Sequence, residues 1–153
     1  MTDGRVRRAV ASDLPAFLVL YRHLRPHEPP PTPAAAERAL AEILKSASTC
    51  IFVLEVPDGT LVASCGLTII PTLGHGAEPF AVIENVVTHA EHRRRGHGAA
   101  VMRAACDAAR AAGCYKLCLS TGSKEEATMR FYEAAGFKRN TKTYFEIRWD
   151  GSS

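Results

Sequence analysis

The spacing of apolar residues predicts two helices in the first third of the chain. A period of three to four residues runs over positions 14–21, with Ser12 as the expected N-cap. The same period runs over positions 33–47, where Thr32 can cap the helix and Pro33 can take its first helical position. We therefore expect two amphipathic helices, each with one face turned to a core.

Shorter apolar runs predict strands. Positions 50–56 and 61–70 flank the turn 57–60, whose Pro-Asp-Gly sequence favours a hairpin because proline presets φ and Asp-Gly suits a tight turn. Four further runs have strand character, at positions 5–10, 80–88, 115–120 and 143–149.

Helix and strand alternate in the second half. An alanine-rich helix is predicted over positions 95–112, ended by Gly113. The capping-box pattern Ser123-Lys-Glu-Glu126 predicts a last helix, which runs to Ala135 and stops at Gly136. The chain is thus expected to be a single α/β (α+β) domain over residues 1–153, with a core over 5–149 and a tail over 150–153.

The composition fits an ordinary globular protein and narrows the class of function. Of 153 residues, 46% are hydrophobic and 23% are charged, so wholesale disorder is not expected. The absence of a bilayer-length apolar run and of a signal segment predicts a cytoplasmic protein with no membrane partner. Five cysteines without metal-ligand spacing predict reduced thiols and no metal site. The net charge of +3 does not by itself indicate nucleic-acid binding.

One basic turn carries the clearest chemical signal. The strand at 80–88 leads into three consecutive arginines, residues 93–95, and then into Gly96 and Gly98 at the start of a helix. Free N–H groups and the dipole at a helix start bind anions, and glycine lets an anion approach the backbone closely. Arginine adds donors that suit phosphate. We therefore expect a phosphate-bearing ligand here, with a pyrophosphate as the simplest choice.

Other interpretations of this turn fit less well. A P-loop requires Lys-Ser or Lys-Thr after the glycines, and a dinucleotide fingerprint requires a glycine where this chain has Val101. Nucleic-acid binding lacks interleaved aromatic residues and a wider basic face. An ordinary solvent-exposed basic turn is the remaining alternative.

The wider pattern resembles a known family. The segment Arg93-Arg94-Arg95-Gly96-His97-Gly98 matches the (Gln/Arg)-x-x-Gly-x-(Gly/Ala) signature of the GNAT superfamily of acyl-CoA-dependent N-acetyltransferases. Ile83-Glu84-Asn85-Val86-Val87 is similar to that family's fourth strand, and Phe131-Tyr132-Glu133-Ala134-Ala135-Gly136-Phe137 to its Phe-Tyr-Glu-x-x-Gly-Phe motif. The resemblance implies a mixed, mostly antiparallel sheet of six to seven strands. About four helices would flank the sheet, which would splay after its fourth strand.

The resemblance also implies a donor and its binding residues. Acetyl-CoA would be the acyl donor, with its pantetheine arm held by the backbone of Val86 and Val87. The pyrophosphate would lie against the backbone amides of six consecutive residues, namely Arg94, Arg95, Gly96, His97, Gly98 and Ala99.

Two residues are expected to move protons. The acceptor amine is mostly protonated at neutral pH, so a base or a water relay must deprotonate it. Glu84 is the candidate, expected to be partly buried on the face of its strand shared with Val82 and Val86. An ion pair with a neighbouring cation, or simple attraction of a cationic substrate, is the alternative role. Tyr132 matches the family tyrosine that can protonate the leaving thiolate.

The acceptor is expected to be a small-molecule primary amine, bound near residues 21–33 and 71–80. The alternatives are acetylation of protein lysines or N-termini, and a non-catalytic acyl-CoA-binding sensor or interaction module. A homodimer is the assembly that family habit suggests.

Overall fold

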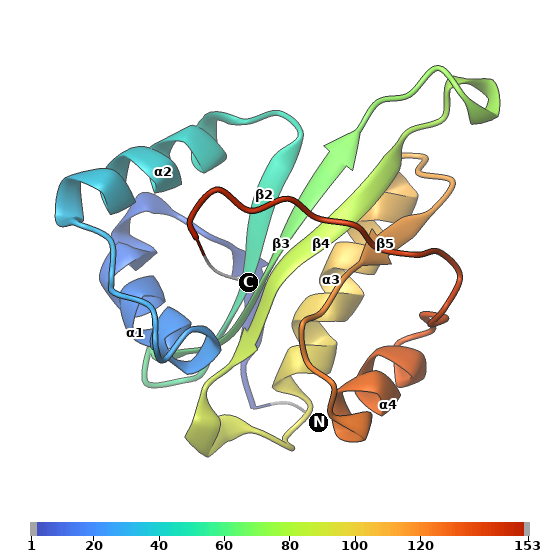
Figure 1. Cartoon of the computed structure of the whole chain (residues 1–153). Helices are drawn as coiled ribbons and strands as arrows, with labels where there is room; N and C mark the ends of the chain where they lie inside the picture. Colours follow the sequence, from blue (N-terminus) through green and yellow to red (C-terminus); the bar gives the residue numbers. More distant parts are fainter. Residues whose placement is uncertain (1–2, 152–153) are drawn as a thin grey trace. The chain divides into compact units, whose positions relative to one another are not determined.

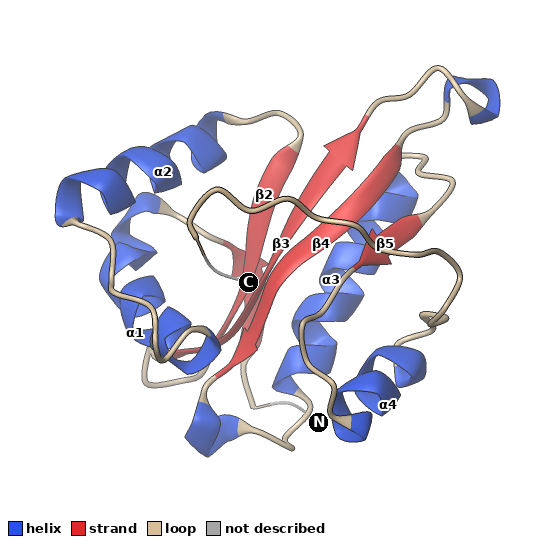
Figure 2. Cartoon of the chain, viewed as in Figure 1, coloured by secondary structure: helices blue, strands red, loops and turns tan. Residues whose placement is uncertain are grey.

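The computed structural model describes residues 3–151 and has two compact units, Met1–Leu119 and Ser120–Ser153. Figure 1 shows the course of the chain, and Figure 2 its helices and strands. The described residues contain no helix with both the length and the apolar character needed to cross a bilayer.

The first unit is built on a five-stranded sheet in the order β1-β2-β3-β4-β5. Its strands are β1 (Arg5–Arg8), β2 (Thr49–Glu55), β3 (Leu61–Ile70), β4 (Phe80–Thr88) and β5 (Leu117–Leu119). The first four pair antiparallel, and β5 pairs parallel to β4. The mixed, mostly antiparallel sheet is as predicted, although the described sheet has five strands where six to seven were expected.

Helices cover both faces of this sheet. Phe17 of α1 (Leu14–Leu24) and Leu40 of α2 (Pro33–Lys45) pack with Ile51 and Val53 of β2 in one buried cluster. On the opposite face, the thiol of Cys65 lies 3.4 Å from a carbonyl oxygen of α3 (His97–Ala111). Successive side chains of each strand point to opposite faces of the sheet, so they contribute to two cores, one under α1 and α2 and the other under α3.

The observed starts of α1 and α2 show which of the predicted capping residues were right. Thr32 caps α2 by accepting the N–H of Ala35, and Pro33 is in the first turn, as predicted. The predicted cap at Ser12 is wrong, because Asp13 instead accepts the N–H of Val10 and closes a short 3-10 turn before α1. The helix predicted to reach position 47 ends at Lys45.

The predicted boundaries around α3 and β5 also shift. The helix begins at His97 and not at residue 95, because Arg94 and Gly96 have left-handed φ values of 60° and 80° that a helix cannot contain. Gly113 follows its end with φ 75°, as predicted. Strand β5 covers three of the six residues expected to form it.

The second unit contains one helix, α4 (Glu126–Ala134). Ser123 was expected to cap it, but its hydroxyl accepts the N–H of Glu125 instead, so the helix starts later. At the other end, Gly136 has φ 96° and donates to the Glu133 carbonyl, while Phe137 donates to that of Tyr132. This is a Schellman ending with Gly136 at C′, which confirms the predicted helix stop.

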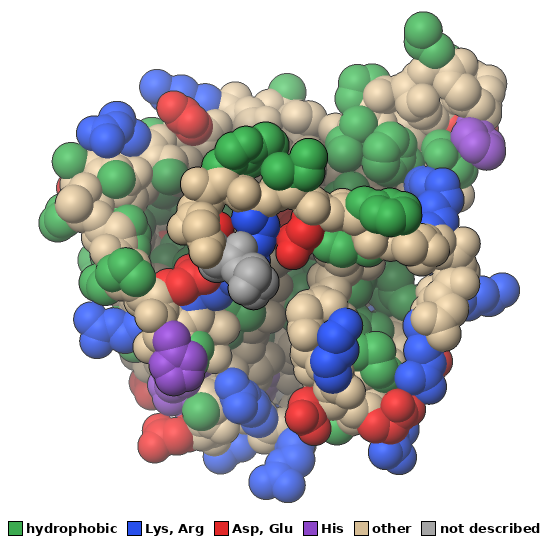
Figure 3. Space-filling model, viewed as in Figure 1, with side chains coloured by type: hydrophobic (Ala, Val, Ile, Leu, Met, Phe, Trp, Pro, Cys, Tyr) green, Lys and Arg blue, Asp and Glu red, His purple; other side chains and the backbone are tan. Residues whose placement is uncertain are grey.

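The strand predicted over residues 143–149 does not form within the described residues. Its odd-numbered residues Phe145, Ile147 and Trp149 keep the alternating apolar pattern but lie on the surface, with Trp149 89% exposed. The hydrophobic side chains of this C-terminal segment appear as green atoms at the surface in Figure 3. An alternating apolar pattern describes the side chains only, whereas a strand also needs an adjacent strand whose backbone forms hydrogen bonds with its own.

Candidate active site

Strand β4 has an outer edge that opens halfway along its length. It pairs with β5 only through residues 81–83, yet continues to Thr88. Among the described strands, none pairs with the outer edge of β4 beyond Ile83, which fits the splay that the family resemblance implies. Val86 and Val87, predicted to hold an extended ligand through their backbone, lie on this part of the strand.

A bulge lies in the middle of the same strand. On β3, Gly66 pairs with Glu84 and Ser64 with Val87, so that Asn85 and Val86 stand opposite one residue. Asn85 has φ 52°, which asparagine tolerates better than most residues. The bulge reverses the alternation of side chains. Val87, and not Val86 as predicted, therefore returns to the face of Glu84.

Glu84 is exposed, which corrects the expectation of partial burial. Its partner Gly66 also pairs with Ile51 of β2, a member of the core beneath α1 and α2. Directly opposed residues in antiparallel strands point to the same side of a sheet. Glu84 therefore stands on the α1–α2 face, at the start of the open edge of β4.

The turn after β4 forms a nest of backbone amides. Left-handed Arg94 and Gly96 alternate with Arg95 and bend the chain sharply before the helix. The first helical hydrogen bond runs from Ala100 to the Gly96 carbonyl, 3.0 Å away. The N–H groups of residues 97–99 precede that bond and remain available to an anion at the positive end of α3. The predicted pyrophosphate cradle thus has a suitable backbone.

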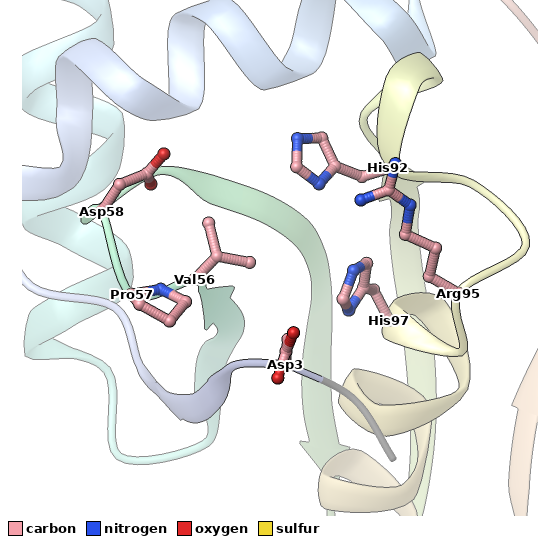
Figure 4. A pocket seen from close by; sticks show the side chains of 7 residues that line it. All are labelled: Asp3, Val56, Pro57, Asp58, His92, Arg95 and His97. Carbon is pink, nitrogen blue, oxygen red and sulfur yellow. The ribbon is translucent and has the colours of Figure 1, made fainter.

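The arginines around this nest are exposed and contribute charge in different ways. The Nε of Arg93 donates to the Thr88 carbonyl at 3.3 Å, which ties the turn to the end of β4. The side chain of Arg95 lines a cavity of about 520 Å³ (Figure 4). The cavity is lined by Asp3, Val56, Pro57, Asp58, His92, Arg95 and His97.

His97, the first residue of α3, also lines this cavity. Its side chain is buried, with 3% of the residue exposed, and lies beside His92 in Figure 4. Burial lowers the pKa of His97, and the neighbouring His92 and Arg95 lower it further. A neutral ring at this position fills the start of α3 without adding a buried charge.

The same end of the first unit holds a row of imidazoles that sequence reasoning missed. The ring centroids of His23 and His89 are 4.1 Å apart, those of His89 and His92 5.3 Å, and those of His92 and His97 6.0 Å. Burial lowers the pKa of His23, and His89 and Arg93 lower it further. Within residues 3–151, no three His, Cys, Asp or Glu side chains are arranged so that they could together hold a metal ion.

Tyr132 belongs to the second unit, where its position follows from the end of α4. It is the C3 residue of the Schellman ending, and its ring lies 6.3 Å from that of Phe137 at C″. The ring centroid of Phe131 lies 5.1 Å from that of Tyr132. These contacts hold the half-buried tyrosine ring in a defined orientation within α4.

The two segments predicted to surround the acceptor contain paired polar residues. Arg25 and Glu28 form an exposed ion pair at 3.2 Å. His75 stacks on Tyr115, with the ring centroids 3.9 Å apart. A third pair, Thr49 and Thr68, lies outside these segments and was not predicted, because it joins hydroxyls of two strands at positions 19 residues apart in the sequence.

Comparison with known proteins agrees with this geometry. The profile of the Acetyltransferase (GNAT) family matches residues 17–137. A glucosamine 6-phosphate N-acetyltransferase of Trypanosoma brucei brucei is 31% identical over 144 residues, which are 93% of this chain and 94% of the relative. The structure of a putative acetyltransferase from Agrobacterium tumefaciens is 42% identical, with a TM-score of 0.88 over 94% of this chain and 99% of that one. A Trypanosoma brucei acetyltransferase structure is 31% identical, with a TM-score of 0.79 over 97% and 99% of the two chains. A splayed sheet, an amide nest and these relatives together place the chain in the GNAT family of acetyltransferases.

Proposed function

We propose that the protein transfers the acetyl group of acetyl-CoA to the primary amine of a small molecule. The observation that supports this most directly is the continuity of two sites. The open outer edge of β4 from Glu84 onward leads into the amide nest of residues 94–99. An extended arm that ends in a pyrophosphate matches this order, because a strand edge binds amide groups and a helix start binds phosphate.

Acetyl-CoA supplies a thioester whose carbonyl carbon an amine can attack. Glu84 is the base in this proposal, because it is a carboxylate at the start of the open edge and accessible to an incoming amine or to a bridging water. The amine must lose a proton before attack, and a carboxylate within hydrogen-bond reach removes it directly or through one water. The carbon–nitrogen bond then forms as the carbon–sulfur bond breaks.

Tyr132 gives its phenolic proton to the departing sulfur in this proposal. We expect Tyr132→Phe to lower kcat about tenfold. The effect is modest for proton transfer, because a thiol with a pKa near 8.5 leaves more easily than an alcohol would. Single-turnover thiol release would measure it, with the exposed Tyr144 changed to phenylalanine as the matched control. Equal rates for Tyr132→Phe and wild type would remove the assigned role.

Two measurements test the function as a whole. Acetyl-CoA at about 100 times its Kd should stabilise the fold by about 2.7 kcal/mol, which corresponds to a rise in Tm of roughly 5–10 °C for a chain of this size. Thiol release is then followed with glucosamine 6-phosphate, polyamines, aminoglycosides and lysine peptides. Binding without turnover of any amine would support the sensor alternative. Turnover of the peptides alone would support a protein acetyltransferase.

A further inference from the structure

We infer that the hydroxyl pair of Thr49 and Thr68 belongs to the acceptor site and selects amines that also carry hydroxyl groups. This rests on the proposed function, since it assigns a substrate class to the site around Glu84. The two hydroxyl oxygens are 3.1 Å apart and join β2 to β3.

The strand register places this pair on the face of the candidate base. Thr68 pairs with Thr49 on one side and with Val82 on the other, while Gly66 pairs with Glu84. Positions 66 and 68 of β3 point to the same side, as do positions 82 and 84 of β4 before the bulge. Glu84 and Thr68 are thus diagonal neighbours on one surface, at a separation of about 7–8 Å.

This end of the face is left open by the two helices above it. Thr49, Thr68 and Val82 are half-buried and Glu84 is exposed, whereas Ile51, the next residue of β2 on this face, is buried. Gly66 contributes no side chain between them. A Cβ built there would have only the Glu84 carbonyl oxygen within 4 Å, at 3.5 Å, so no side chain of the described residues covers Gly66 beside the carboxylate.

The chemistry of this surface points to a hydroxylated amine. Two hydroxyls that share one hydrogen bond retain one donor and three acceptor positions between them. A ligand whose ammonium group meets Glu84 can therefore bond these hydroxyls through a hydroxyl of its own. Val82 supplies an apolar contact between the two points. Amino sugars and polyhydroxylated amino alcohols have this combination, whereas polyamines and lysine side chains lack the hydroxyls.

The test removes one hydroxyl from the protein and one from the ligand. Thr68→Val keeps the side-chain shape and should lower kcat/KM for glucosamine and glucosamine 6-phosphate about tenfold, mainly through KM. Glucosamine is then deoxygenated in turn at each hydroxyl. For the wild type, one deoxy analogue should react about tenfold more slowly than glucosamine. That analogue should react at the same rate with Thr68→Val as with the wild type. Cys50→Ala, on the opposite face of β2, is the matched control and should leave all rates unchanged.

The possible outcomes separate this inference from the proposed function. If Thr68→Val affects every acceptor equally or none, the inference is wrong while the acetyltransferase activity stands. The same conclusion follows if the wild type acetylates only amines without hydroxyl groups. If the wild type acetylates no amine at all, the proposed function itself fails and the inference falls with it. An unchanged Tm for Thr68→Val confirms that the comparison is made on folded protein.

Discussion

Replacing Glu84 by glutamine is expected to lower kcat at neutral pH by about 10²–10⁴-fold. The amide has nearly the same shape but cannot accept the proton of the acceptor amine. Acetyl-CoA binding should not change, because the amide nest and the β4 backbone remain intact. The measurement is thiol release against pH. In Glu84→Gln the rate should rise about tenfold per pH unit until the free amine becomes the main species.

Exposed Glu78, in the loop before β4, provides the matched control as Glu78→Gln. It removes one negative charge near the same strand without touching the open edge. If both variants lose activity equally, Glu84 only contributes to attraction of a cationic substrate. Full activity of Glu84→Gln on the true acceptor would exclude it as the base.

The largest effect on stability is expected at Asp13. Its two carboxylate oxygens each accept from Arg7 at 2.8 Å, and one also accepts the N–H of Val10. Arg7 in turn donates to Glu55. Asp13 is buried, so Asp13→Ala leaves the half-buried Arg7 with only Glu55 as a carboxylate partner among the described residues and should reduce the free energy of unfolding by about 3 kcal/mol. Urea unfolding measures this loss.

The exposed pair of Arg25 and Glu28 is the control for Asp13. Glu28→Ala should change the unfolding free energy by less than about 1 kcal/mol, because solvent screens that pair. An equal loss in both variants would mean that burial does not distinguish the two pairs.

Acid should reveal the same interaction. The hydrogen bonds from Arg7 hold the pKa of Asp13 below its ordinary value of 3.8. A carboxyl group whose folded pKa is depressed contributes full stability above the unfolded pKa and loses it as pH falls through the folded pKa. Wild type should therefore lose this contribution below about pH 3.8, and Asp13→Ala should show a flatter stability curve over that range. Parallel curves for the two proteins would contradict the assignment.

Local chemistry was enough to predict several elements. The hairpin over residues 57–60 forms because its proline, aspartate and glycine each favour the turn by themselves, and Gly59 has φ 86°. Thr32 with Pro33, and Gly136 with Phe137, mark helix ends for the same reason. The turn of backbone amides after β4 was also predictable, since glycines between a strand and a helix favour such a turn with few distant contacts.

Distant contacts decided the rest of the site. Nothing near Asn85 in sequence indicated a bulge, because the bulge depends on how β4 aligns with Ser64 and Gly66 of β3. The hydroxyl pair of Thr49 and Thr68 depends on the register of β2 and β3. The row of histidines joins α1 to the turn after β4. Residues 143–149 have the pattern of a strand, but pairing requires a partner that a pattern does not specify.

The sequence by itself determined the family, the order of most helices and strands, and a turn of backbone amides at the start of α3, because these depend on residues close together along the chain. Only the tertiary structure decided which side chains share the face of Glu84. Strand register, and a single residue in the left-handed conformation, set that face, and a shift of one residue reverses it.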